Sequence, residues 1–221
     1  MNKIFTPSKN EFLSITCNEL YQSYLISMKH KDFFTIVLSG GNTPRMVYNF
    51  LIEHYLDKIN WMKVHFFWSD ERCVPLNHQD SNYRLAHDYF LKFISPCSVN
   101  RIEGELSPLE AANKYQNHIE SFFLKFKLTG FDFSLLGMGE DGHTASLFSD
   151  SDLSETRMVT VTKSSSHKHT RVSMGLNLLN NSTKNVLLVS NDNKYELFLS
   201  AENYPFNSLT RVTAVILGEQ H

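Results

Sequence analysis

The sequence is poor in cysteine, and its charges nearly balance. Only three cysteines, Cys17, Cys73 and Cys97, occur among 221 residues. Their odd number and wide spacing argue against a cysteine-ligated metal or a disulfide framework and favour reduced thiols in a cytoplasmic protein. The formal net charge of −2 gives no general attraction to polyanions. We therefore expect no nucleic-acid partner, and any basic site must be local.

Long apolar runs are also missing. No segment is apolar over the length that a lipid bilayer requires, and the first residues, MNKIFTPSKNEF, lack the hydrophobic centre of a signal peptide. We therefore expect no membrane association. The chain also has no internal repeat and no linker rich in glycine or proline. Since 42% of the residues are hydrophobic and 13% are aromatic, the composition favours one well-filled domain over residues 1–221.

What the sequence does contain is an alternation of short apolar runs with segments of helical periodicity. This alternation predicts an α/β protein whose parallel sheet is covered on both faces. The predicted strands lie at 33–41, 64–72 (a strand that runs into a charged loop), 131–139, 157–161, 185–190 and 213–218. The predicted helices cover 42–56, 81–94, 107–126 and 193–202, and the polar segment 149–170 is predicted to be mostly loop.

Two of the predicted helices begin with recognisable capping residues. Thr43 is the predicted N-cap of the helix 42–56, with Pro44 at its first helical position. Ser107 and Glu110 have the spacing of a capping box at the start of the next long helix.

Ligands bind at the carboxyl ends of strands in parallel sheets, so the segments that follow the strands are the first places to look for a site. The first is LSGGNTPR, residues 38–45. Paired glycines expose successive backbone N–H groups, and the following helix adds a partial positive charge, which together suit a phosphate. The segment is neither a P-loop nor a dinucleotide fingerprint. An ordinary strand-to-helix turn would explain it equally well.

The second segment is FFWSDERCVP, residues 66–75. Asp70, Glu71 and Arg72 follow a buried strand directly, and charge at such a place must be paired or solvated. Arg72 could bind a sugar phosphate or a developing oxyanion, oriented by an acidic neighbour. A salt-bridged corner without function is the competing interpretation.

The third segment is LLGMGEDGHTASLF, residues 135–148. Gly139 and its neighbouring glycines let a ligand approach the backbone, and Asp141 and His143 follow at the mouth of the sheet. An imidazole can take a proton from water, and a carboxylate beside it strengthens it as a base. The alternative is a capped helix start, with Asp141 as N-cap and a helix continuing beyond His143. Because three strand ends of this kind occur in one chain, we favour a functional site.

Other features are less informative. His167 and His169 form a His-x-His pair in a segment rich in serine and lysine, and no third ligand is indicated, so the pattern favours a solvated loop over a zinc site. The sequence has neither an HExxH motif nor a GxSxG elbow, which argues against a zinc protease and an α/β-hydrolase triad.

The three strand-end segments resemble a known family. LSGGNTPRMVYNFL, FFWSDERCVPLNHQDSNYRLAHDYFL and FDFSLLGMGEDGHTASLF are similar, in order and spacing, to the three motif blocks of the 6-phosphogluconolactonases. Weaker similarity continues through HTRVSMGLNLLNN and NDNKYELFLSAE. The related glucosamine-6-phosphate deaminases share the first and third features. Their middle block, however, has an Asp-Glu-Tyr pattern where this chain has SDER followed by DSNYR.

The resemblance implies a Rossmann-like α/β fold and hydrolysis of 6-phospho-D-glucono-1,5-lactone to 6-phosphogluconate in the oxidative pentose phosphate pathway. It implies no metal and no organic cofactor. His143 would be the general base that activates water and then return the proton to the leaving ring oxygen, with Asp141 as its neighbour. The residues that it would place against the substrate are Gly40, Gly41, Asn42, Thr43, Asp70, Arg72, Gly139, Arg171 and Lys194.

Two other functions remain as alternatives. An amino-sugar phosphate deaminase or isomerase needs a dedicated base for a carbon acid, and none can be placed in the SDER block. A phosphosugar-sensing domain of a regulator needs an output module, for which no segment is available. We expect a small-molecule sugar-phosphate lactone as the only partner and a monomer or weak homo-oligomer.

Overall fold

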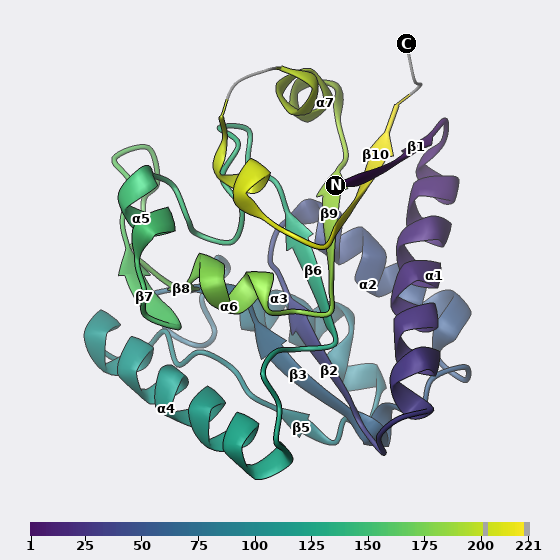
Figure 1. Cartoon of the computed structure of the whole chain (residues 1–221), viewed down its shortest axis with the longest axis horizontal. Coiled ribbons are helices and arrows are strands. Elements are labelled where there is room, and N and C mark those ends of the chain that lie inside the picture. Colours follow the sequence, from purple (N-terminus) through teal and green to yellow (C-terminus); the bar gives the residue numbers. More distant parts are fainter. Residues whose placement is uncertain (201–202, 219–221) are drawn as a thin grey trace.

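A parallel sheet of seven strands runs through the centre of the computed structural model, which describes residues 1–200 and 203–218 (Figure 1). Every pair of neighbouring strands is parallel, in the order β1-β10-β9-β6-β2-β3-β5. In chain order these strands are β1 (Asn2–Thr6), β2 (Phe34–Leu38), β3 (Val64–Trp68), β5 (Ser98–Val99), β6 (Phe133–Gly137), β9 (Lys184–Val189) and β10 (Val212–Leu217). The predicted α/β class with a mostly parallel sheet is confirmed.

Helices cover the sheet on both sides, with α1 and α2 to the right of it in Figure 1 and α4 at the lower left. The helices are α1 (Lys9–Met28), α2 (Asn42–Tyr55), α3 (Asn82–Tyr89), α4 (Pro108–Phe126), α5 (Asp150–Ser154), α6 (Leu176–Asn180) and α7 (Asp192–Leu199). Short 3₁₀ turns lie at η1 (Trp61–Lys63), η2 (Leu91–Phe93) and η3 (Pro205–Ser208). Residues 201 and 202 of the helix predicted over 193–202 lie outside the described residues.

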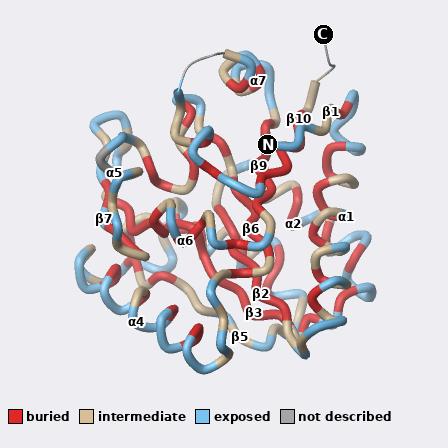
Figure 2. The backbone as a smooth tube through the Cα atoms, viewed as in Figure 1, coloured by how far each residue is buried: buried red, intermediate tan, exposed pale blue. Residues whose placement is uncertain are grey.

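Strand β3 shows why an uninterrupted apolar run encodes a strand at the centre of such a sheet. Its side chains point alternately to the two faces, and all five are buried. Phe66 packs on Phe90 (ring centroids 5.6 Å apart), which in turn stacks on Tyr48 of α2. Phe67, on the other face, packs on Phe122 of α4 at 5.1 Å. Figure 2 shows the same concentration of buried residues in the central strands.

A second, antiparallel sheet of three strands lies beside the first, in the order β4-β8-β7. Its strands are β4 (Asp70–Arg72), β7 (Val159–Thr162) and β8 (Arg171–Met174). The prediction that the end of segment 64–72 is a charged loop is therefore wrong. The backbone of this charged tripeptide pairs with β8, and its two buried carboxylates accept hydrogen bonds from the Arg72 backbone and from Asn82 and Ser146 of other segments.

Two of the predicted helix starts also differ in detail. Gly41, not Thr43, is the N-cap of α2, and Thr43 lies inside the helix. At α4 the Ser107 hydroxyl donates to the Glu110 carboxylate at 3.4 Å and does not cap the backbone, so the predicted capping box does not form. Ser81 caps α3 and its hydroxyl accepts a backbone N–H of the first turn.

Strand β1 and helix α1 were not predicted. The buried face of α1 includes Thr16, Cys17 and Ser27 among its apolar residues, so the apolar periodicity that signals a core-facing helix is weak there.

No helix in the described part of the chain combines the length and the apolar character needed to cross a lipid bilayer.

Candidate active site

A cavity of about 190 Å³ opens at the carboxyl ends of β2 and β6, next to the second sheet. Three segments that are far apart in the sequence meet there, as the parallel topology predicts. The predicted site residues that line it are Gly40, Gly41, Asp70, Arg72, Gly139, His143, Arg171 and Lys194. Asn42, Thr43 and Asp141 do not line it. The structure thus shows which of the predicted residues lie at the cavity, whereas the roles of all of them stay predictions.

The segment after β6 forms a closed loop. The alternative interpretation, a capped helix that starts at Asp141, does not hold, because the next helix, α5, begins only at Asp150. The loop is held by its own hydrogen bonds, from Gly139 N–H to the His143 carbonyl oxygen (2.8 Å) and from the Thr144 hydroxyl to the Gly137 carbonyl oxygen (3.1 Å). The loop therefore fixes the backbone of His143 relative to the end of β6.

Asp141 and His143 form a hydrogen-bonded pair in this loop. His143 Nδ1 lies 2.5 Å from Asp141 Oδ1, and the hydrogen bond from His143 lowers the pKa of Asp141 to about 2. An ionised carboxylate can only accept, so Nδ1 carries the hydrogen and Nε2 is the basic nitrogen of the ring. Gly139 makes the pair possible, since a Cβ there would lie 2.2 Å from the imidazole and 2.6 Å from Asp141 Oδ1.

Two arginines form the basic wall of the cavity. Arg72 of β4 and Arg171 of β8 are cross-strand partners, so two like charges face each other across the antiparallel pair. The Nε atoms of both are buried and have no hydrogen-bond partner among the described residues. Burial, together with the charge of Arg72, lowers the pKa of Arg171. Two opposed guanidinium groups with unsatisfied donors are a suitable site for an anion.

Glu71 holds Arg72 and the start of α3 in place. Its carboxylate accepts hydrogen bonds from the backbone N–H groups of Arg72 (2.8 Å), Asn82 (2.7 Å) and Tyr83 (2.8 Å), and from the Ser81 hydroxyl (3.0 Å). Burial raises the pKa of Glu71, while these backbone donors act in the opposite direction. The SDER and DSNYR motifs are thus two halves of one hydrogen-bonded corner, which leaves the arginine to face the cavity.

Asp70 and Lys194 differ in whether their charged groups have partners within the described residues. Asp70 Oδ2 accepts from the Ser146 hydroxyl (2.6 Å) and lies 3.9 Å from Arg171 NH1, so this carboxylate is already engaged by the protein. Lys194, at the start of α7, lines the cavity without an ion-pair partner in residues 1–200 and 203–218. Burial lowers its pKa. Asp70 therefore positions the arginine wall, whereas the Lys194 ammonium remains free for a ligand.

The glycine-rich turn before α2 supplies backbone donors. Gly41 is the N-cap residue and has φ +101°, a conformation that favours glycine. The first N–H groups of a helix have no partner within it and carry the positive end of its dipole. The Thr43 side chain, in contrast, is bonded to Ser190 Oγ at 2.6 Å. We therefore expect this segment to contact a ligand through its backbone.

His167 and Asn82 line the cavity and were not predicted. The His167 ring lies edge-on to His143 with centroids 5.1 Å apart, and it stacks on Phe148 at 4.6 Å. Burial, together with the positive charges of Arg171 and Arg72, lowers its pKa. The segment around His167 is a loop, as predicted, but the ring is only partly exposed because it packs on His143 and Phe148. No local pattern in the sequence signals this packing.

The comparisons with known proteins identify the family of the chain. The family model for glucosamine-6-phosphate isomerases/6-phosphogluconolactonase matches residues 7–210. The chain belongs to this family. It is 33% identical over 189 residues to the 6-phosphogluconolactonase of Treponema pallidum, covering 82% of this chain and 78% of that protein. It is 37% identical over 181 residues to 6-phosphogluconolactonase 3, chloroplastic, of Arabidopsis thaliana, with 76% of this chain matched, and spans 56% of that protein's length.

Solved structures place the whole described fold within the same glucosamine-6-phosphate isomerase/6-phosphogluconolactonase family. The 6-phosphogluconolactonase from Thermotoga maritima matches with a TM-score of 0.87 and 28% identity, covering 99% of both chains. A monomeric glucosamine-6-phosphate deaminase matches with a TM-score of 0.82 at 19% identity, a likeness that concerns the fold alone. The resemblance predicted from the three motif blocks is confirmed.

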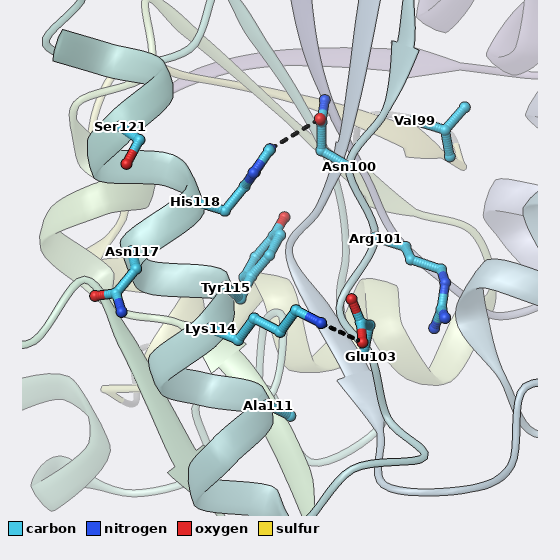
Figure 3. Close-up of a pocket in the computed structure, with 10 residues that line it drawn as sticks. All are labelled: Val99, Asn100, Arg101, Glu103, Ala111, Lys114, Tyr115, Asn117, His118 and Ser121. Carbon is cyan, nitrogen blue, oxygen red and sulfur yellow. Dashed lines mark hydrogen bonds and ion pairs between the residues drawn. The ribbon is translucent and has the colours of Figure 1, made fainter.

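This family member has a second, larger cavity of about 480 Å³ between α4 and residues 99–103 (Figure 3). Its polar side chains are largely engaged with one another. Lys114 pairs with Glu103 at 2.8 Å, and His118 Nε2 lies 2.9 Å from Asn100 Oδ1. This cavity is therefore distinct in chemistry from the one at the strand ends.

Two groups of side chains in the described residues could offer three ligand atoms each to a metal ion. Asp141, His143 and His167 form one group, and His78, Asp80 and His169 form the other; within each, the ligand atoms lie within 4.8 Å of one another. The first group includes the Asp141–His143 pair of the cavity. The second lies outside the cavity lining.

Proposed function

We propose that this chain hydrolyses 6-phospho-D-glucono-1,5-lactone to 6-phospho-D-gluconate, a step of the oxidative pentose phosphate pathway. The observation that carries the proposal is an Asp–His pair beside a wall of three cationic side chains in one cavity, formed by Arg72, Arg171 and Lys194. A base for water and a receptor for an anionic group are the two elements that this reaction needs. The family and the names of the relatives support this substrate class.

His143 starts the reaction as the general base. Its Nε2 takes a proton from a water molecule, which attacks the lactone carbonyl carbon C1, while Asp141 holds the ring and stabilises the imidazolium that forms. A lactone is an activated ester, so no nucleophilic serine or cysteine is required. The carbonyl oxygen becomes the oxyanion of a tetrahedral intermediate.

The intermediate then collapses with loss of the ring oxygen. Backbone N–H groups at Gly40 and Gly41 stabilise the oxyanion; removing one such donor from an enzyme typically raises the barrier by about 2.7–4 kcal/mol. The C1–O5 bond breaks, and the protonated His143 donates its proton to the departing oxygen, which becomes a hydroxyl group. The same histidine thus works twice and is neutral again at the end.

The arginine wall binds the 6-phosphate. A phosphate between Arg72 and Arg171 relieves the repulsion of the two opposed guanidinium groups and offers acceptor oxygens to their N–H groups that face the cavity. Lys194 adds a third positive charge. This arrangement fixes the substrate at the end remote from C1 and leaves C1 next to His143.

A coupled assay tests the function. Glucose-6-phosphate dehydrogenase generates the lactone in place, and 6-phosphogluconate dehydrogenase reports the acid. The protein is expected to accelerate ring opening above the spontaneous rate, and to hydrolyse phosphate-free glucono-1,5-lactone at least about tenfold less efficiently, since the charged hydrogen bonds to the phosphate are lost. Absence of acceleration, or release of ammonia from glucosamine 6-phosphate, would contradict the proposal.

A further inference from the structure

The second histidine and carboxylate group lies at the edge of the basic wall, outside the cavity. His78 and Asp80 belong to the turn between β4 and α3, and His169 lies two residues before the start of β8. The three side chains are part-buried, with exposed fractions of 31%, 36% and 16%. Because the turn and the His169 segment are remote in sequence, only the fold brings these groups together.

The geometry of this group is that of a ligand set. Asp80 Oδ2 lies 2.8 Å from His169 Nε2 and 3.7 Å from His78 Nδ1, and the rings of the two histidines are 5.5 Å apart at 79° to each other. In a tetrahedral zinc site with bonds of 2.0–2.1 Å, ligand atoms are about 3.3 Å apart. The observed separations lie on either side of that value.

The hydrogen bonds now made by the group are ones that a metal ion would replace. His78 Nδ1 accepts the backbone N–H of Asp80 at 3.1 Å, so an ion bound at this nitrogen takes the place of that donor. The hydrogen bond from His169 lowers the pKa of Asp80, which keeps the carboxylate ionised. A metal ion would replace the hydrogen atom that now joins His169 to Asp80.

We propose that His78, Asp80 and His169 form an accessory binding site for a divalent transition-metal ion of the Zn²⁺ type. Two imidazole nitrogens and one carboxylate oxygen are the ligands that Zn²⁺ takes in proteins, with water completing the coordination. Mg²⁺ and Ca²⁺ prefer sites made of oxygen and do not fit this set.

The ion would fasten the two strands that carry the arginines. Arg72 NH1 donates to the backbone carbonyl oxygen of Asp80 at 2.6 Å, and Arg171 follows His169 by two residues. Next to the β4–β8 ladder, a backbone hydrogen bond from Cys73 to Thr170 at 2.9 Å also joins these two segments. A metal bridge at this point holds β4 and β8 together where their like charges oppose each other, so the ion stabilises the basic wall without touching the substrate.

Zn²⁺ titration by isothermal calorimetry tests the site. The variant His169→Gln is expected to bind one Zn²⁺ equivalent fewer than the wild type, whatever number the wild type binds. His87→Gln is the matched control, because His87 also pairs with a carboxylate, Asp88 at 3.2 Å, but is not part of a group of three ligands. This control is expected to retain the wild-type stoichiometry, and Mg²⁺ is expected not to compete.

The position of the ion is a second, independent measurement on the wild type. Crystals soaked in Zn²⁺ should give an anomalous peak between His78 and His169. A peak confined to Asp141, His143 and His167, or an unchanged stoichiometry and affinity in folded His169→Gln, would overturn the proposal. Neither readout depends on catalytic activity.

Discussion

The cavity at the strand ends and the cavity on α4 are lined by similar residue types, but the hydrogen bonding of their basic side chains differs. The cavity on α4 is the larger, at about 480 Å³ against about 190 Å³, and it too contains a histidine, a lysine and an arginine. Its Lys114 and Arg101 are each paired with a glutamate. At the strand ends, the buried Nε donors of Arg72 and Arg171 have no partner within residues 1–200 and 203–218. Unsatisfied donors, rather than size, therefore distinguish the candidate active site.

The largest expected effect is the difference in kcat/KM between substitutions of the histidines in the two cavities. His143→Ala is expected to lower kcat/KM for the lactone by about 10²- to 10⁴-fold, because the general base and the proton donor are both lost. His118→Ala is the matched control, since burial lowers the pKa of His118 and its ring is also hydrogen-bonded. Steady-state kinetics with the spontaneous rate subtracted measure both. Equal losses in the two variants would remove the distinction between the cavities.

The arginines should differ next. Arg171→Ala is expected to raise KM by about ten- to a hundredfold, the value of one charge-assisted hydrogen bond of about 1.5–3 kcal/mol. Arg101→Ala removes an arginine that is already paired with Glu105, so its KM should stay at the wild-type value. The difference in KM between the two arginine variants is expected only for the phosphorylated lactone. With phosphate-free lactone, a comparable rise in KM for Arg171→Ala would show that this arginine does not bind the phosphate.

The hydrogen-bonded corner around Glu71 should contribute to the stability of the fold. Glu71→Gln is expected to lower the free energy of unfolding by about 1–3 kcal/mol, because an amide N–H₂ would face backbone donors. Burial raises the pKa of Glu71 above 4.5, so the folded state holds this proton more tightly than the unfolded chain. The difference in the free energy of unfolding between the wild type and Glu71→Gln should therefore become smaller as the pH rises above 4.5. Urea unfolding at several pH values measures it, and a gap that widens with pH would contradict the assignment.

The smallest expected effect is in the larger cavity. Lys114→Ala breaks an exposed ion pair with Glu103, which contributes no more than about 1 kcal/mol. Its kcat and KM for the lactone should remain within about twofold of the wild type. Lys194→Ala is the comparison variant, because Lys194 lacks an ion-pair partner among the described residues and lines the site. If the two lysine variants behaved alike, Lys194 would not contact the substrate.

Local patterns predicted the apolar strands of the central sheet better than the elements around them. The apolar run of β3 is buried on both faces, so its sequence contains the whole signal. Helix α1 escaped prediction because its buried face includes residues such as Thr16 and Ser27. Strand β4 escaped because Asp70–Arg72 is charged throughout, and its burial depends on hydrogen bonds to residues from other segments.

What the sequence alone determined is local chemistry. Asp141 and His143 are two residues apart, and with Gly139 nearby their pairing needs only one tight loop. The alternation of strands and helices likewise sets the parallel sheet, and with it the edge at which the site lies.

Only the tertiary structure decided which cations meet. Arg72 and Arg171 face each other because β4 pairs with β8, and backbone pairing between distant segments leaves no pattern in either segment. The placement of His167 beside His143, and of His169 beside Asp80, follows from the same return of the chain. The Asp141–His143 pair is thus a property of one loop, whereas the pairing of Arg72 with Arg171 is a property of the fold.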